Sequence, residues 1–165
     1  MLDRDKMNCM TLIAGKNASA TGRVLVAHNE DDGGFVVVRH GWVPAQDWAA
    51  GSVMPAEEGC AEIPQVSHTL GYYWTEYRKD TCGLTTADGF VNERGVVIVS
   101  NSMGTSRESM ENADCVKDGG IGYNLRRALA ERAGSAREGA RILMELIDEW
   151  GYAPSGRAYT IADKD

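Results

Sequence analysis

The chain has 165 residues, which favours a single domain and is long enough to bury a hydrophobic core. Its 43% hydrophobic and 25% charged residues are typical of a folded globular protein, and its net charge of -7 argues against nucleic-acid binding as the main function. No apolar run approaches the roughly 20 residues that span a bilayer, and residues 1–8 lack the apolar segment of a secretory signal. We therefore expect a cytoplasmic protein without a membrane or nucleic-acid partner.

Short strands dominate the first third of the chain. Residues 10–15 and 23–29 are predicted as strands that are joined by the polar loop 16–22 (KNASATG). A third strand is predicted over residues 35–40. The segment 41–66 shows no clear period, so we expect a long irregular loop, a kind of segment that is commonly functional in compact domains.

A second group of strands is predicted in the middle of the chain. The aromatic segment 71–77 (GYYWTEY) is expected to pack in a core or interface rather than to contact substrate. Residues 83–90 and 96–101 are predicted as the two arms of a hairpin. The second arm begins with the continuous apolar run VVIV, which is typical of a strand that is covered on both faces. The sheet should therefore have layers on both sides.

Two helices and a last strand complete the predicted elements. Apolar residues at helical spacing begin at Ile121, and this helix is expected to end near Gly134. A capping box begins the second helix at Ser135, and Gly151 is expected to end it. Residues 157–162 (RAYTIA) are predicted as the final strand. This order of elements predicts an α+β fold.

The first hairpin gathers residues that are suited to catalysis. If the loop folds the chain back, facing residues have numbers that sum to roughly 38, within a register slip. This pairing sets Cys9 beside Asn29 and close to His28 and Asp31. A thiol that faces polar groups at the end of an apolar ribbon is the arrangement of a cysteine nucleophile. The alternatives are a buried structural cysteine and an Asp that only forms a turn.

The position of Cys9 close to the start of the chain offers a built-in base. If residues 1–8 are removed as a leader, Cys9 gains a free α-amine, whose ordinary pKa is roughly 7.7 to 8.0. That amine can take the thiol proton near neutral pH, so no separate catalytic histidine is required. Asn101 ends an apolar strand and is a candidate amide donor to an oxyanion, or else the start of a turn. A Cys-His-Asn protease stays an alternative, because such partners meet only in the fold.

The spacing of the four cysteines does not predict a metal site. No C-x-x-C occurs, and neither a metal nor a cofactor signature is present in the sequence. Without a secretory signal, reduced thiols are favoured over a disulfide framework. A bridge between Cys60 and Cys82 is the minority alternative.

Several motifs resemble those of a known enzyme family. Residues 9–19 (CMTLIAGKNAS), followed by residues 27–31 (AHNED), resemble the N-terminus of the family C69 dipeptidases. These are N-terminal nucleophile (Ntn) hydrolases, which are related to the bile salt hydrolases and penicillin V acylases. The likeness continues through residues 40–44, 95–101, 124–127 and 155–164, and so covers nearly the whole chain.

The resemblance implies a fold and a role for each site residue. It implies an Ntn-type αββα sandwich, of which residues 9–165 form the N-terminal portion, with residues 1–8 as a leader or propeptide. Cys9 is then the nucleophile, Asp31 holds its freed amine, and Asn101 is an oxyanion donor. His28 stands where the related acylases often carry an Arg and is assigned to the surroundings of the nucleophile. Asn29 is assigned a substrate contact.

The implied function is hydrolysis of dipeptides by a cysteine, without a cofactor. One alternative is a non-peptide amidase or acylase of the same superfamily, and the other is an inactive truncated remnant that acts as a binding module. Members of the family are much longer, so the last strand should leave an unpaired sheet edge. We therefore expect either a homo-oligomer or pairing with a missing C-terminal portion.

Overall fold

The computed structural model is an α+β arrangement in layers, and it describes residues 9–30, 36–55, 59–79, 85–103, 116–152 and 156–165. Within these residues, the largest sheet has five antiparallel strands in the order β3-β6-β7-β8-β9. Its strands are β3 (Val36–Val43), β6 (Tyr72–Lys79), β7 (Thr85–Asn92), β8 (Val97–Ser102) and β9 (Arg157–Ala162). The α+β prediction is confirmed. The segment that the sequence marked only as an aromatic cluster is the strand β6, which pairs with β3 far back along the chain.

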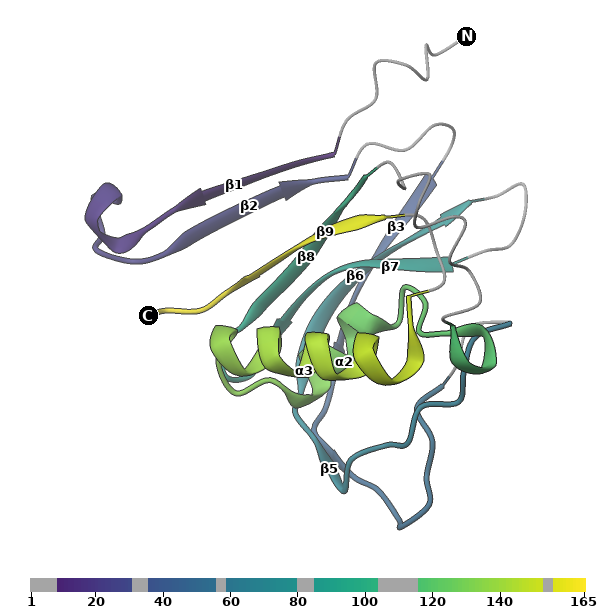
Figure 1. Ribbon diagram of the computed structural model, residues 1–165. Coiled ribbons are helices and arrows are strands. Elements are labelled where there is room, and N and C mark those ends of the chain that lie inside the picture. The colour runs from purple at the N-terminus through teal and green to yellow at the C-terminus, as the bar shows by residue number, and fades with distance from the viewer. Residues whose placement is uncertain (1–8, 31–35, 56–58, 80–84, 104–115, 153–155) are drawn as a thin grey trace, which may run out of the picture.

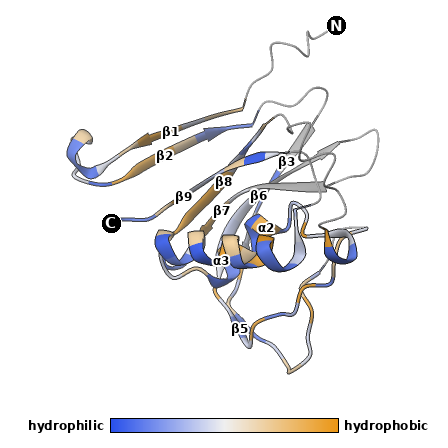
Figure 2. Cartoon of the chain, in the orientation of Figure 1, coloured by the Kyte–Doolittle hydropathy of each residue, from blue (hydrophilic) through white to orange (hydrophobic). Residues whose placement is uncertain are grey.

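The predicted first hairpin is formed by β1 (Met10–Ala14) and β2 (Leu25–Asn29), with the short 3-10 helix η2 (Lys16–Ala18) in its loop. The numbers of facing residues sum to 39, one more than the central expectation and within the slip that it allowed. Met10 and Leu12 share one face of β1, and they are 56% and 61% exposed. Figure 2 shows hydrophobic colour along much of both strands.

The helices α2 (Leu125–Arg132) and α3 (Ala136–Trp150) pack on the opposite face of the sheet from the hairpin (Figure 1). The predicted capping box is present, because the Ser135 side chain accepts a hydrogen bond from the Glu138 amide at 3.2 Å. The Glu138 carboxylate in turn accepts from the Gly134 amide at 2.8 Å. Gly151, with φ at 73°, ends α3 as predicted. The first helix begins at Leu125, later than expected, after the 3-10 helix η4 (Lys117–Gly119).

The strand β8 is covered on both faces of the sheet. Ile98 is fully buried in a cluster that includes Leu129 of α2, on the helix face of the sheet. The next residue, Val99, points to the other face and is only 5% exposed. The hairpin contacts β8 on that second face, where Asn101 meets Thr11. The prediction of a strand covered on both faces is therefore confirmed.

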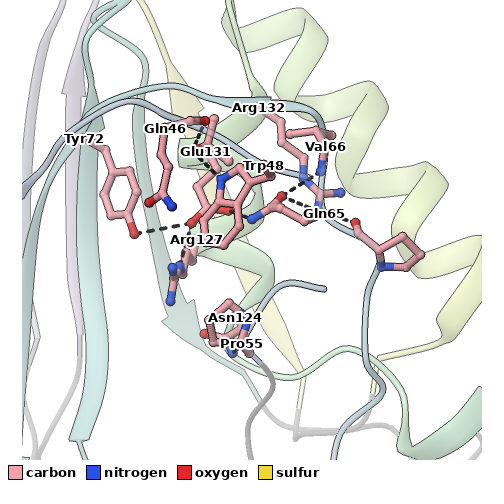
Figure 3. Close-up of polar contacts among 12 residues, drawn as sticks. Gln46, Trp48, Pro55, Gln65, Val66, Tyr72, Asn124, Arg127, Glu131 and Arg132 are labelled. Atoms are coloured by element: carbon pink, nitrogen blue, oxygen red, sulfur yellow. Dashed lines mark hydrogen bonds and ion pairs between the residues drawn. The ribbon is translucent and has the colours of Figure 1, made fainter. Parts of the chain in front are cut away.

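In its described residues, the long segment between β3 and β6 contains the short strands β4 (Gln46–Asp47) and β5 (His68–Thr69). A polar cluster attaches this segment to α2 (Figure 3). The Glu131 side chain, 2% exposed, accepts hydrogen bonds from Arg127 Nε at 2.7 Å and from Gln65 Nε2 at 2.8 Å. The Glu131 carbonyl also accepts from the Leu70 amide at 2.8 Å. A buried carboxylate with these partners replaces its lost hydration and fixes the path of the segment.

The strand β9 forms one edge of the five-stranded sheet, with β8 as its single neighbour among the described residues. Its bounds match the predicted strand. The expectation that a second copy or a further portion of the chain pairs with β9 stays a prediction. None of the described helices is both long and apolar enough to cross a membrane.

Candidate functional site

The thiol of Cys9 lies beside a carboxylate at the open end of the first hairpin. Cys9 directly precedes β1, and its Sγ is 3.3 Å from Glu30 Oε1. The register explains this contact, because Met10 faces Asn29 and the next pair outward is Cys9 with Glu30. The hairpin therefore fixes the thiol and the carboxylate on one face of the ribbon.

His28 extends this contact along the same face. Its Nε2 lies 3.4 Å from Glu30 Oε2, and its Nδ1 lies 2.9 Å from Thr11 Oγ1. The His28 side chain is only 8% exposed, so these partners substitute for water. Thr11 and His28 face each other in the register, and their shared face explains why their side chains meet.

Thr11 joins the hairpin to the main sheet. Its Oγ1 donates to Asn101 Oδ1 at 2.6 Å, across 90 residues of sequence. A hydroxyl donates only one proton, so the contact with His28 requires Nδ1–H of the ring as donor. A second ring proton on Nε2 lets His28 donate to Glu30 as well, so a doubly protonated ring satisfies both of these contacts. The Asn101 oxygen is occupied by Thr11, which leaves the Nδ2 hydrogens for another acceptor.

The structure brings three of the five predicted site residues into one network: Cys9, His28 and Asn101. Asp31 lies outside the described residues, so its role as the holder of the freed amine stays a prediction. Asn29 is exposed and faces Met10, which places its side chain on the other face of the hairpin from His28. Its assigned substrate contact is likewise still a prediction.

Sequence reasoning missed Thr11 and Glu30 as members of the site. Two signals were available. Thr11 lies two residues after Cys9, so both side chains share one face of the strand. Glu30 directly faces Cys9 once the register sum is 39 rather than 38, since a slip of one residue changes every facing pair.

A cleft of about 430 Å³ lies between the hairpin and the main sheet, toward the loop end of the hairpin. It is lined by Gly22, Arg23, Val24, Val26, Gly95, Val97, Ala162, Asp163 and Lys164. Cys9 is not among these residues, because it lies at the opposite end of the ribbon. We therefore place the candidate chemistry at the Cys9 end and not in this cleft.

Comparison with known proteins agrees with the resemblance that the sequence motifs suggested. No curated protein matches the chain significantly. The family model for peptidase family C69 matches residues 8–165, which is nearly the full length and includes every residue of the Cys9 network. The chain therefore belongs to peptidase family C69.

Proposed function

We propose that this protein is a cysteine-dependent hydrolase of dipeptides, in which the Cys9 thiol is the nucleophile and its freed α-amine is the base. Membership of peptidase family C69 supports the class of reaction. The single observation that carries the assignment to residues is the unbroken series of contacts from Cys9 through Glu30, His28 and Thr11 to Asn101. It gathers a nucleophile and an amide donor from two separate parts of the chain.

The first half of the proposed reaction forms a thioester. Removal of residues 1–8 frees the α-amine of Cys9, which takes the proton of the thiol. The thiolate attacks the carbonyl carbon of the peptide bond and gives a tetrahedral intermediate with a negative oxygen. Asn101 Nδ2 donates to that oxygen, while Thr11 fixes the rotation of the amide by holding its Oδ1. The C–N bond then breaks, and the leaving amine takes the proton from the Cys9 ammonium group.

The second half restores the enzyme. A water molecule gives a proton to the α-amine and attacks the thioester, and the first amino acid leaves as its carboxylic acid while the proton returns to sulfur. Asp31, carried over from the resemblance, is proposed to orient the ammonium form of Cys9 between these steps. No separate base is needed, since one residue supplies both the nucleophile and the proton acceptor.

Glu30 and His28 are proposed to set the charge around the sulfur. A carboxylate 3.3 Å from the thiol opposes the formation of a second negative charge on sulfur. A doubly protonated His28, 3.4 Å from the same carboxylate, offsets that repulsion. The pair therefore holds the nucleophile in position while keeping the local charge near zero.

The identity of the mature N-terminus tests the proposal most directly. Intact mass and N-terminal sequencing of the active protein should show a chain that begins at Cys9. Cys9→Ala should abolish both dipeptide turnover and labelling by a mild alkylating agent at the N-terminus. Cys60→Ala is the matched control, because Cys60 is the other cysteine in the described part of the chain and lies outside the Cys9 network. Full turnover by the Cys9→Ala protein would refute the assignment.

The choice of substrate is tested on the same preparation. We expect turnover of unmodified dipeptides to exceed turnover of N-acyl amines and β-lactam amides. The reverse order would replace the dipeptidase with a non-peptide amidase. An uncleaved Met1 together with an unreactive Cys9 would favour a binding module instead.

A further inference from the structure

The Glu30 carboxylate lies against the sulfur that the proposed reaction acylates. Its Oε1 is 3.3 Å from Cys9 Sγ, and the hairpin holds the two residues as a facing pair on one face of the ribbon. Thr11 and His28 form the next pair on that face, and Thr11 contacts Asn101 of β8. The carboxylate therefore lies on the side of the hairpin that faces the main sheet, together with the nucleophile and the candidate oxyanion donor.

Each oxygen of the Glu30 carboxylate has a partner, but the proposed reaction removes one of them. Oε2 lies 3.4 Å from His28 Nε2, which takes no part in the bonds that form and break. Oε1 accepts from the Cys9 thiol, and an acylated sulfur carries no proton and cannot donate. The Glu30 side chain is only 16% exposed, so water has limited access to replace the lost donor. In the acyl-enzyme, Oε1 therefore needs a new donor.

The acyl group of a dipeptide carries such a donor at a suitable distance. Its N-terminal residue has an α-ammonium group, and only the Cα and the carbonyl carbon separate that nitrogen from the sulfur of the thioester. The short bonds between these atoms keep the nitrogen within roughly 4 Å of the sulfur. A carboxylate oxygen that lies 3.3 Å from the same sulfur can therefore accept a charge-assisted hydrogen bond from the ammonium group.

We propose that Glu30 binds the α-ammonium group of the substrate and thereby selects peptides with a free N-terminus. This inference rests on the proposed function, and it names the group by which that site recognises a dipeptide. With the ammonium group on Glu30 and the carbonyl oxygen on Asn101 Nδ2, two contacts hold the carbonyl carbon at the Cys9 sulfur. A substrate without the ammonium group makes only one of these contacts and leaves Glu30 Oε1 without a donor.

The test measures binding without turnover. The full chain carrying Cys9→Ala is titrated by calorimetry with Ala-Ala and with propionyl-Ala, in which a hydrogen replaces the ammonium group. Cys9→Ala removes the thiol donor, so Glu30 Oε1 is open to the ligand as in the acyl-enzyme. We expect Ala-Ala to bind about tenfold or more tightly than propionyl-Ala, because hydrogen bonds to a charged group are among the stronger ones. Adding Glu30→Gln should abolish this preference. Glu145→Gln removes the same charge from the exposed face of α3 and should leave the preference intact.

A second variant guards against loss of folding. Glu30→Asp keeps the charge but shortens the side chain, so it should retain only part of the preference. Equal binding of the two ligands by the Cys9→Ala protein, or no binding of Ala-Ala, would overturn the inference, and so would a full preference in a folded Glu30→Gln variant. An ammonium preference that depends on Glu30 in a protein whose Cys9 form lacks dipeptidase activity would refute the proposed reaction alone. Dipeptidase activity without the preference would refute only the role of Glu30.

Discussion

Thr11→Val removes the link between the hairpin and the main sheet while nearly preserving the shape of the side chain. The lost hydroxyl donates to Asn101 Oδ1 at 2.6 Å and contacts His28 Nδ1 at 2.9 Å. Each such hydrogen bond contributes about 0.5–1.5 kcal/mol, so the two together are worth about 1–3 kcal/mol. If the whole effect falls on the transition state, kcat/KM should drop by a factor of about 5 to 150. Val suits a strand as well as Thr does, so the hairpin itself should persist.

The assay compares dipeptide turnover by the wild type, Thr11→Val and Thr11→Ser. Thr11→Ser keeps the hydroxyl and should keep most of the activity. If the methyl group of Thr11 mattered instead, Thr11→Ser would lose activity. Alkylation of the Cys9 thiol should continue in Thr11→Val, because the contact between Cys9 and Glu30 does not include Thr11. A kcat/KM for Thr11→Val within twofold of the wild type would refute the positioning role that we assign to this hydroxyl.

Three further predictions concern stability. Glu131→Ala leaves the buried donors of its partners without an acceptor and should lower the free energy of unfolding in urea by about 3 kcal/mol. Glu145→Ala breaks a 2.6 Å ion pair on the exposed face of α3 and should lower it by less than about 0.5 kcal/mol. Similar losses in the two variants would contradict the role of burial. Ser135→Ala removes the helix cap and should cost about 1 kcal/mol, with Ser135→Gly costing only a few tenths, as measured by thermal melting. Burial raises the pKa of Tyr72 from 10.0 to about 12. The contribution of the neutral Tyr72 hydroxyl to the free energy of unfolding is therefore fully present below pH 10 and is lost as the pH rises toward 12. Urea unfolding at pH 8 and pH 11 should therefore show a larger loss for the wild type than for Tyr72→Phe, and parallel losses would contradict this.

Local signals predicted the elements whose ends are defined by their own residues. The helix α3 lies between its caps Ser135 and Gly151, because a side-chain cap and a glycine with positive φ each act within one turn of the chain. The strand β9 was predicted with its observed bounds. The strand β6 was not predicted as a strand, because its aromatic residues also fit a packed loop and its pairing partner β3 lies about 30 residues away.

The candidate site was predicted in part, and the division follows from what a hairpin can specify. The sequence named Cys9, His28 and Asn101 and placed the first two near each other, because a short loop limits the possible registers. It did not assign a site role to Thr11 or Glu30. Their roles depend on a register that is exact to one residue and, for Thr11, on the packing of the hairpin against β8.

The sequence by itself therefore determined the kinds of element, the presence of a nucleophile near a polar cluster, and membership of the C69 family through its motifs. Only the tertiary structure decided which groups touch: the thiol with Glu30, Thr11 with Asn101, and Arg157 with the ring of Tyr123. The physical reason is the distance along the sequence over which each kind of interaction acts. Caps, turns and alternation act over a few residues, whereas contacts across 90 residues are fixed only when layers pack and buried polar groups must find partners.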